Sequence, residues 1–311
     1  MFVASSLSVG LRSFATALCL LVLLACAVQK PPTPVTVAGD RQFTDEDGRT
    51  ITVPAKIERF ISLAPNLTEI AYAVGAGDRL VGNTTFCDYP EDAKKVQKVG
   101  DTLQPSIERI LALRPQLVLV STASQLETFT KQLHEHRIAV YVTDPRDLEG
   151  VFRSIENLGK LLNQEQRAQE TLGQLRERAS SISQRVSSDE PVKVFYQLSA
   201  EPLYTAGRDS FVTDLIRRAG GLSVTADVPE AWPRFSQEAA VATRPEAIIL
   251  PTDGSMGSAN SEVAEGLKRS PAALSGKVYK INGDFLSRPG PRAVDGLEAL
   301  ARALHPAAFS R

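Results

Sequence analysis

The sequence predicts an α/β protein with two Rossmann-like lobes, built on mostly parallel sheets and joined by one long helix. A duplicated segment is the first observation: Leu111-Ala-Leu-Arg-Pro-Gln-Leu-Val-Leu-Val120 recurs as Val241-Ala-Thr-Arg-Pro-Glu-Ala-Ile-Ile-Leu250. Each copy has the pattern of a helix that ends before a proline and is followed by a buried strand. The second observation is a stretch from Leu148 to about Val186 that lacks proline and has apolar residues at helical spacing. Because the copies lie in opposite halves of the chain, we expect a ligand cleft between two lobes.

The N-terminal lobe is expected over residues 41–143. It begins with an edge hairpin over residues 41–53, where the residues alternate around Asp47-Gly48. Short apolar runs and helical spacing then alternate, which is typical of a parallel sheet. We expect strands at 59–63, 80–83, 117–120 and 138–142, and helices at 67–74, 107–113 and 125–136.

Residues 144–188 are expected to form the linker helix. A continuous helix of this length would be on the order of 50 Å long and would resist bending, so only small lobe movements are expected. The C-terminal lobe is expected over residues 189–311. Its strands are expected at 192–197, 248–250 and 278–281, and its last helix ends near Leu304.

The first 25 residues have the features of a signal peptide. Arg12 precedes an apolar run from Phe14 to Leu24 that is too short to span a bilayer comfortably. Leu23-Leu24-Ala25-Cys26 resembles a bacterial lipobox, which predicts cleavage before Cys26 and diacylglycerol on its thiol. Cleavage of an ordinary signal peptide at a nearby small residue is the alternative. We therefore expect an exported protein, periplasmic or at the cell surface, anchored to a membrane through lipidated Cys26 and a proline-rich tether over residues 26–40.

The composition excludes some classes of function. The chain has 35 basic and 36 acidic residues and no prominent basic cluster, so nucleic-acid binding is not expected. After leader removal and lipidation, Cys87 is the remaining free thiol, and no intramolecular disulfide is expected. We expect a monomer stabilised by its apolar cores.

No enzymatic chemistry is indicated. His134 and His136 are two residues apart on a predicted helix, so they point apart and cannot share a metal ion. The chain has no Gly-x-Ser-x-Gly elbow, phosphate-binding glycine loop or His-Glu-x-x-His motif. We therefore expect no catalytic residues, no metal site and no permanently bound cofactor. A secreted α/β enzyme, with buried carboxylates converging in the cleft, and a structural lipoprotein with a filled cleft are the alternatives from other classes.

Four segments together resemble a known family: Arg59-Phe-Ile-Ser-Leu-Ala-Pro-Asn-Leu-Thr-Glu-Ile70, Val81-Gly-Asn-Thr-Thr-Phe-Cys-Asp-Tyr-Pro90, Trp232-Pro-Arg-Phe-Ser-Gln-Glu238 and Asp284-Phe-Leu-Ser-Arg-Pro-Gly-Pro-Arg292. Through them, residues 58–311 resemble the helical-backbone (class III) ABC-transporter substrate-binding proteins, a family of iron-siderophore, haem and cobalamin receptors. The cobalamin-binding members are the most similar. The resemblance implies a solute receptor that delivers a metal chelate to an ABC permease dimer with ATPase subunits.

The resemblance also implies which residues bind the ligand. A flat macrocycle needs aromatic and aliphatic walls and a few polar groups at its edge. Phe86 matches one wall and Trp232 the opposite one, although either would otherwise be read as a core residue. Arg288 would otherwise be a solvated loop arginine. The full set of ligand-binding residues implied is Phe86, Tyr196, Leu198, Trp232, Asp284, Phe285 and Arg288.

Cobalamin or a related corrinoid is the expected ligand, with a ferric siderophore or haem as the alternative. One departure from the pattern bears on this choice, because Ser121-Thr-Ala-Ser124 stands where the cobalamin receptors carry a second tryptophan. Haem receptors commonly supply a tyrosine or histidine ligand to the iron, for which Tyr89, Tyr196 and Tyr204 are the candidates.

Two acidic residues match the contacts that dock such receptors on the permease. Glu127 and Glu238, one in each lobe, are implied to form salt bridges with permease arginines. Each also has a local interpretation, since Ser124 to Glu127 has the pattern of a capping box, and Glu238 follows Ser236 at a helix start.

Overall fold

The computed structural model describes residues 39–121, 127–252 and 262–310. At its start, strands β1 (Arg41–Thr44) and β2 (Thr50–Val53) form the predicted antiparallel hairpin. Glu46 attaches the turn of this hairpin to the segment that follows the N-terminal lobe, because its carboxylate accepts hydrogen bonds from Ser154 Oγ at 2.7 Å and from the backbone amide of Asp144 at 2.8 Å. Burial raises the pKa of Glu46, against the lowering effect of these hydrogen bonds.

The N-terminal lobe is built on a four-stranded parallel sheet in the order β4-β3-β5-β6. Its central strands are short and apolar on both faces, which fits a parallel sheet covered by helices. The strands are β3 (Phe60–Ser62), β4 (Leu80–Asn83), β5 (Leu117–Ser121) and β6 (Ala139–Thr143). The helices are α2 (Pro65–Ala73), α3 (Ile107–Ala112) and α4 (Glu127–Glu135).

The C-terminal lobe is organised around β7 (Val192–Ala200). One edge of β7 pairs in parallel with β10, and its other edge pairs with β9 in parallel and β8 antiparallel. The remaining strands are β8 (Leu203–Thr205), β9 (Gly221–Ser223), β10 (Ala247–Thr252) and β11 (Val278–Asn282). The helices are α7 (Phe211–Arg218), α8 (Gln237–Ala242), α9 (Pro271–Leu274), α10 (Gly283–Ser287) and α11 (Ala293–Leu304). The predicted α/β class with mostly parallel sheets is therefore confirmed.

The duplicated segment has the same local structure in both lobes. In each copy a short helix, α3 or α8, is followed two residues after its end by an arginine in the left-handed region, Arg114 or Arg244, both with φ of 46°. The residue after the proline then enters the sheet in the same way. Gln116 donates its amide to the carbonyl of Arg59 at 2.9 Å, and Glu246 donates to the carbonyl of Lys193 at 2.8 Å.

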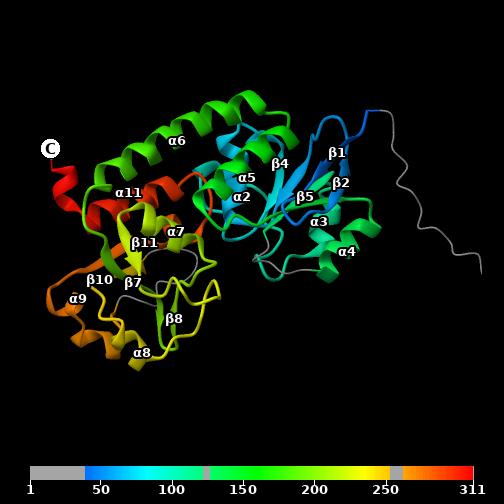
Figure 1. Cartoon of the computed structure of the whole chain (residues 1–311). Helices are drawn as coiled ribbons and strands as arrows, with labels where there is room; N and C mark the ends of the chain where they lie inside the picture. The colour runs from blue at the N-terminus through cyan, green and yellow to red at the C-terminus, as the bar shows by residue number, and fades with distance from the viewer. Residues whose placement is uncertain (1–38, 122–126, 253–261, 311) are drawn as a thin grey trace, which may run out of the picture. The chain divides into compact units, whose positions relative to one another are not determined.

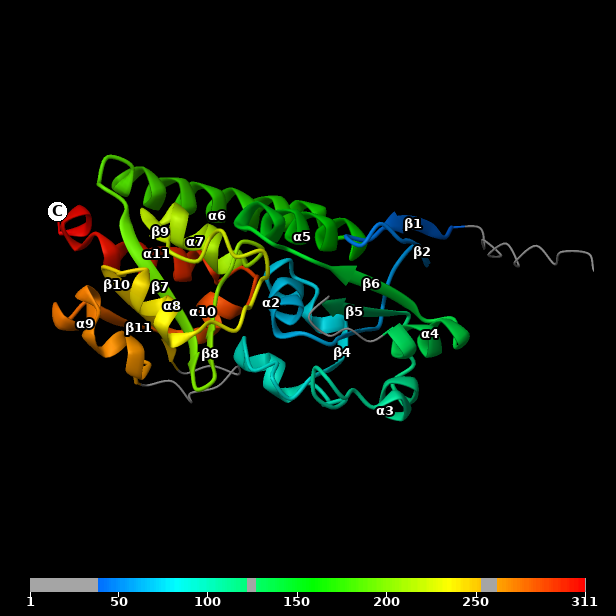
Figure 2. The ribbon, with the colours of Figure 1, turned by 60° about the horizontal axis from the view of Figure 1, so that its bottom comes forward.

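The predicted single linker helix is two helices, α5 (Leu148–Leu161) and α6 (Glu165–Val186). The helical conformation is interrupted at Asn163, which has φ of 54°. Asparagine adopts this left-handed region more readily than most residues. Ala168 of α6 packs directly against Gly159 of α5, where a Cβ atom would collide with it. The apolar spacing continues across the break, and for this reason the spacing predicted one helix. Helix α6 contacts both α2 and α11, so it connects the lobes (Figures 1 and 2).

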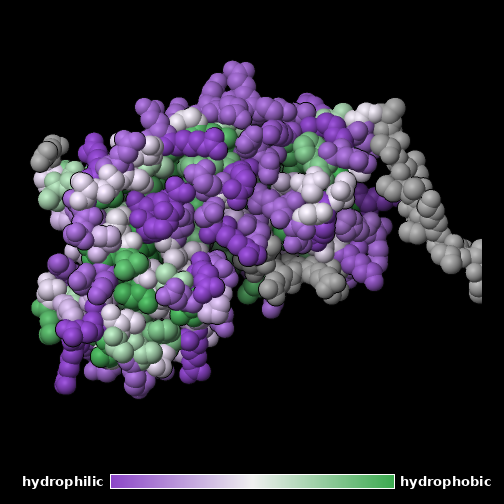
Figure 3. Space-filling model, viewed as in Figure 1, coloured by the Kyte–Doolittle hydropathy of each residue, from purple (hydrophilic) through white to green (hydrophobic). Residues whose placement is uncertain are grey.

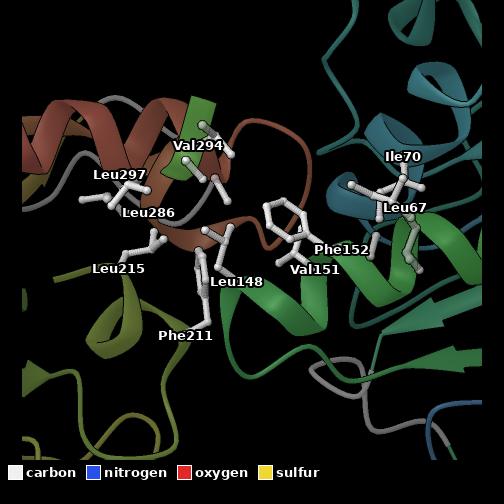
Figure 4. Packing of buried hydrophobic residues seen from close by; sticks show 14 of the residues in the cluster. Leu67, Ile70, Leu148, Val151, Phe152, Phe211, Leu215, Leu286, Val294 and Leu297 are labelled. Atoms are coloured by element: carbon white, nitrogen blue, oxygen red, sulfur yellow. The ribbon is translucent and has the colours of Figure 1, made fainter. Parts of the chain in front are cut away.

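One apolar core extends through both lobes. Leu67 and Ile70 of α2 pack near Val151 and Phe152 of α5, and the same cluster continues to α7, α10 and α11 (Figure 4). The start of α5 is also attached to the C-terminal lobe, because Asp214 of α7 accepts a hydrogen bond from the amide of Leu148 at 3.0 Å. The surface of α6 in view is mainly hydrophilic (Figure 3). Helix α5 is thus part of the core that both lobes share, and α6 packs its buried face on the same core.

Candidate functional site

The two lobes meet through five charged residues, which we call the ionic cluster. Glu69 of α2 and Asp88, which follows β4, come from the N-terminal lobe. Asp284 of α10, Arg288 and Arg292 come from the C-terminal lobe. The polar residues after β3, β4 and β11 follow the carboxyl ends of parallel strands, which is where ligand sites form in open α/β sheets.

Arg288 is the centre of the ionic cluster and is only 3% exposed. Its Nη1 lies 2.7 Å from Asp88 Oδ1 and 3.3 Å from Glu69 Oε1, and its Nη2 lies 3.0 Å from Asp284 Oδ1. Nη2 also donates to the carbonyl oxygen of Phe86 at 3.4 Å. Arg288 is therefore a buried contact between the lobes, and its predicted contact with ligand stays a prediction.

Arg292 forms a bidentate pair with Glu69. Its Nε donates to Glu69 Oε2 at 3.0 Å, and its Nη2 donates to Glu69 Oε1 at 2.6 Å. The guanidinium stacks over the rings of Tyr89, 4.1 Å from the centroid, and of Phe285, 5.4 Å away. Sequence reasoning missed Glu69 and Arg292 as site residues. The available signal was one acidic residue among the apolar residues of the first helix.

The loop that follows β4 carries the first predicted wall. Phe86 is 39% exposed and Tyr89 is 47% exposed, so one loop presents two aromatic rings to solvent, and grouped exposed apolar side chains mark binding surfaces. Lys98 supports this loop from within the lobe, because its Nζ donates to Asn83 Oδ1 at 2.8 Å and to the carbonyl of Cys87 at 3.1 Å. Desolvation by burial lowers the pKa of Lys98. The loop is thus held by Lys98 on one side and by Arg288 on the other.

The second predicted wall consists of Trp232 with Tyr196 packed beside it. Their ring centroids are 6.3 Å apart, and Trp232 and Leu198 are both partly buried against the apolar core. Tyr196 has no exposed surface, its hydroxyl has no hydrogen-bond partner among the described residues, and burial raises its pKa. Ligand contact by Tyr196 would require movement of its neighbours. Of the other tyrosines considered for haem iron, Tyr204 is partly buried.

The two predicted docking residues lie at helix starts. Glu238 is exposed in the first turn of α8, where Ser236 caps the helix by accepting a hydrogen bond from the amide of Ala239 at 3.0 Å. Together with Glu201 and Arg234, Glu238 lines a surface hollow of about 440 Å³. Glu127 is the first residue of α4, and its side chain lies outside the described part of the chain, as do Ser124 and Cys26.

In the described residues, no set of three or more His, Cys, Asp and Glu side chains could hold a metal ion. His305 has structural contacts, with Nε2 3.0 Å from the carbonyl oxygen of Gly220 and Nδ1 3.3 Å from Asp189. Within the same residues, no helix combines the length and apolarity needed to cross a membrane.

Comparisons with known proteins point to one family. The model of the periplasmic binding protein family matches residues 61–282. The uncharacterised ABC transporter substrate-binding lipoprotein YvrC of Bacillus subtilis is 33% identical over 272 residues, which cover 85% of each chain. The periplasmic vitamin B12 binding protein BtuF of Vibrio cholerae has a TM-score of 0.72 at 28% identity, over 82% of this chain and 99% of that one. A periplasmic heme binding protein from Pseudomonas aeruginosa has a TM-score of 0.72 at 27% identity, over 80% of this chain and 93% of the other.

Proposed function

Because this chain belongs to the periplasmic binding protein family of ABC importers, we propose that it captures cobalamin or a related corrinoid and delivers it to an ABC permease. Like its relatives, the chain is a solute receptor and not an enzyme. The proposal concerns which solute it binds. The similarity to a vitamin B12 binding protein over nearly the whole of that protein supports the corrinoid.

The observation that carries this proposal is the exposure of aromatic rings on the loop after β4. Phe86 and Tyr89 expose apolar surface beside the lobe boundary, and Trp232 lies partly buried in the other lobe. A large, flat ligand can cover such rings and remove their apolar surface from water. A ferric siderophore or haem is the second candidate, which the similarity to a heme binding protein supports. Tyr89 is the exposed tyrosine available to haem iron, but Arg292 stacks on its ring.

The test is isothermal titration calorimetry with a soluble form of the chain that begins at Ala27. Cyanocobalamin, a ferric hydroxamate siderophore and haemin are titrated separately. Tight one-to-one binding of cyanocobalamin, weakened at least about tenfold by Trp232→Ala and less by Trp232→Phe, is the expected result. If haemin or the siderophore bound and cyanocobalamin gave no heat, the ligand would be the second candidate and not a corrinoid.

We further propose that the chain is anchored by lipid on Cys26 and docks on the permease through Glu127 and Glu238. Exposed carboxylates that meet arginines across an interface act mainly on association and orientation. Glu238→Ala should therefore leave solute affinity unchanged and reduce solute-stimulated ATP hydrolysis by the cognate importer in proteoliposomes. Glu201→Ala, on the rim of the same hollow, is the matched control. Equal solute-stimulated ATP hydrolysis with the wild type and the Glu238→Ala variant would contradict the docking role.

A further inference from the structure

The ionic cluster has an excess of negative charge. Its three carboxylates, on Glu69, Asp88 and Asp284, surround the two guanidiniums of Arg288 and Arg292. Asp88 is the member most open to solvent, since its side chain is 47% exposed. Burial favours its neutral form, but the hydrogen bond and charge of Arg288 outweigh that effect and lower the pKa of Asp88. A ligand at this boundary therefore meets an ionised carboxylate.

The arginines of the ionic cluster are already engaged. Both terminal nitrogens of Arg288 contact carboxylates, and Arg292 is paired with Glu69 through two nitrogens. Carboxylates on a ligand need guanidinium groups that are free to form such pairs. The exposed Arg234, near Trp232 in the sequence, shares its hollow with two more carboxylates. Lys94 and Lys98, which interact electrostatically with Asp88, are themselves engaged. Lys94 pairs with Glu91, and Lys98 donates to oxygens at the end of β4 and in the loop after it, so the cations described here offer little to an anionic ligand.

Two polar atoms beside the ionic cluster lack partners. Within the described residues, Arg288 Nε and Ser287 Oγ are buried and make no hydrogen bond. A buried donor without an acceptor costs free energy, and a neutral acceptor such as an amide carbonyl relieves that cost without adding charge. A neutral or an anionic oxygen could satisfy these two groups, so the discrimination against anionic ligands comes from the excess of carboxylates in the ionic cluster.

We propose that the ionic cluster makes this receptor select ligands with an uncharged periphery and reject ligands with peripheral carboxylates. The proposal rests on the proposed function, which places the ligand against Phe86 and Arg288. It adds a determinant of specificity, the accessible carboxylate of Asp88, held in place by Arg288. The aromatic walls alone would not distinguish such ligands, because they contact only the face of the ring system.

The test uses two pairs of probes that differ in charge but share a ring system. One pair is cyanocobalamin and its monocarboxylic acid, in which one side-chain amide is hydrolysed. The other is haemin dimethyl ester and haemin, which has two ionised propionates. At low ionic strength the charged member of a pair should bind about three- to fivefold more weakly, as expected for like charges near a partly exposed site. The difference should shrink in high salt.

Asp88→Asn removes the accessible charge and keeps an oxygen for Arg288. In this variant the difference within each pair should fall below about twofold. The matched control is Asp92→Asn, four residues away, where the carboxylate is exposed and paired with Lys95 at 2.7 Å. The control should keep the wild-type preference. Equal or tighter binding of the charged probes by wild type, or an unchanged preference in Asp88→Asn, would overturn the inference while leaving the proposed function intact. Failure of cyanocobalamin to bind would instead remove the corrinoid, and the haemin pair would decide the charge preference.

Discussion

Removing Glu69 from the ionic cluster should be costly. Its side chain is 2% exposed and lies within 3.3 Å of both Arg288 and Arg292. In Glu69→Ala, Arg288 keeps Asp88 and Asp284 as partners, whereas Arg292 is left with one carboxylate oxygen 3.7 Å away. Breaking a buried ion pair typically costs about 3–5 kcal/mol. Because Arg288 keeps two of its partners, we expect the free energy of unfolding to fall by about 3 kcal/mol, the lower end of this range.

The assay is urea unfolding, followed by far-ultraviolet circular dichroism and by the fluorescence of Trp232, the only tryptophan of the chain. The control is Glu58→Ala, because Glu58 is exposed and pairs with exposed Lys56 at 2.7 Å. The free energy of unfolding of that variant should fall by less than about 0.5 kcal/mol. If the free energy of unfolding of Glu69→Ala fell by less than about 1 kcal/mol, the ionic cluster would contribute no more than surface ion pairs do. That result would refute its role as a buried, stabilising contact.

Three further predictions concern the stability of the protein to unfolding. Phe152→Ala should lower the free energy of unfolding by about 3–5 kcal/mol, measured by urea unfolding, because Phe152 is buried in the core that both lobes share. The stabilisation from Asp88 should be full above the ordinary pKa of aspartate and disappear as the pH falls through its lowered pKa, so wild type and Asp88→Asn should differ in stability at neutral pH and converge in acid. Gly220→Ala should cost about 1–2 kcal/mol or more in thermal or urea unfolding, because Gly220 has φ of 78° and a Cβ atom there would collide with His305.

The fold was predictable to the extent that local pattern determines it. The duplicated segment specified a helix, a break before proline and a buried strand, and both copies follow that order down to the conformation of Arg114 and Arg244. The break at Asn163 was not predictable in the same way. Apolar residues continue at helical spacing through it, and the close packing of Gly159 on Ala168 depends on tertiary structure.

The site was predictable only in part. Resemblance indicated Phe86 and Arg288, and the structure brings these two together across the lobe boundary, where the Phe86 carbonyl accepts from Arg288. The pairing of Arg292 with Glu69 joins residues 223 positions apart, and no local periodicity records such a partner. The burial of Tyr196 beside Trp232 likewise depends on how the loop that carries Trp232 folds back along β8.

The membership of α5 in the core that both lobes share limits how this chain can be recombined. Its lobes are not interchangeable modules, because Phe152 and its neighbours pack in one core with side chains of α2 and of α7, α10 and α11 (Figure 4). A chimera that takes its C-terminal half from a relative would have to inherit α5 from the same parent as α7 and α11, and would then have to repack α2. New solute specificity in this lineage should therefore arise by substitution in the loops that follow the strands, and exchange of whole lobes should be rare.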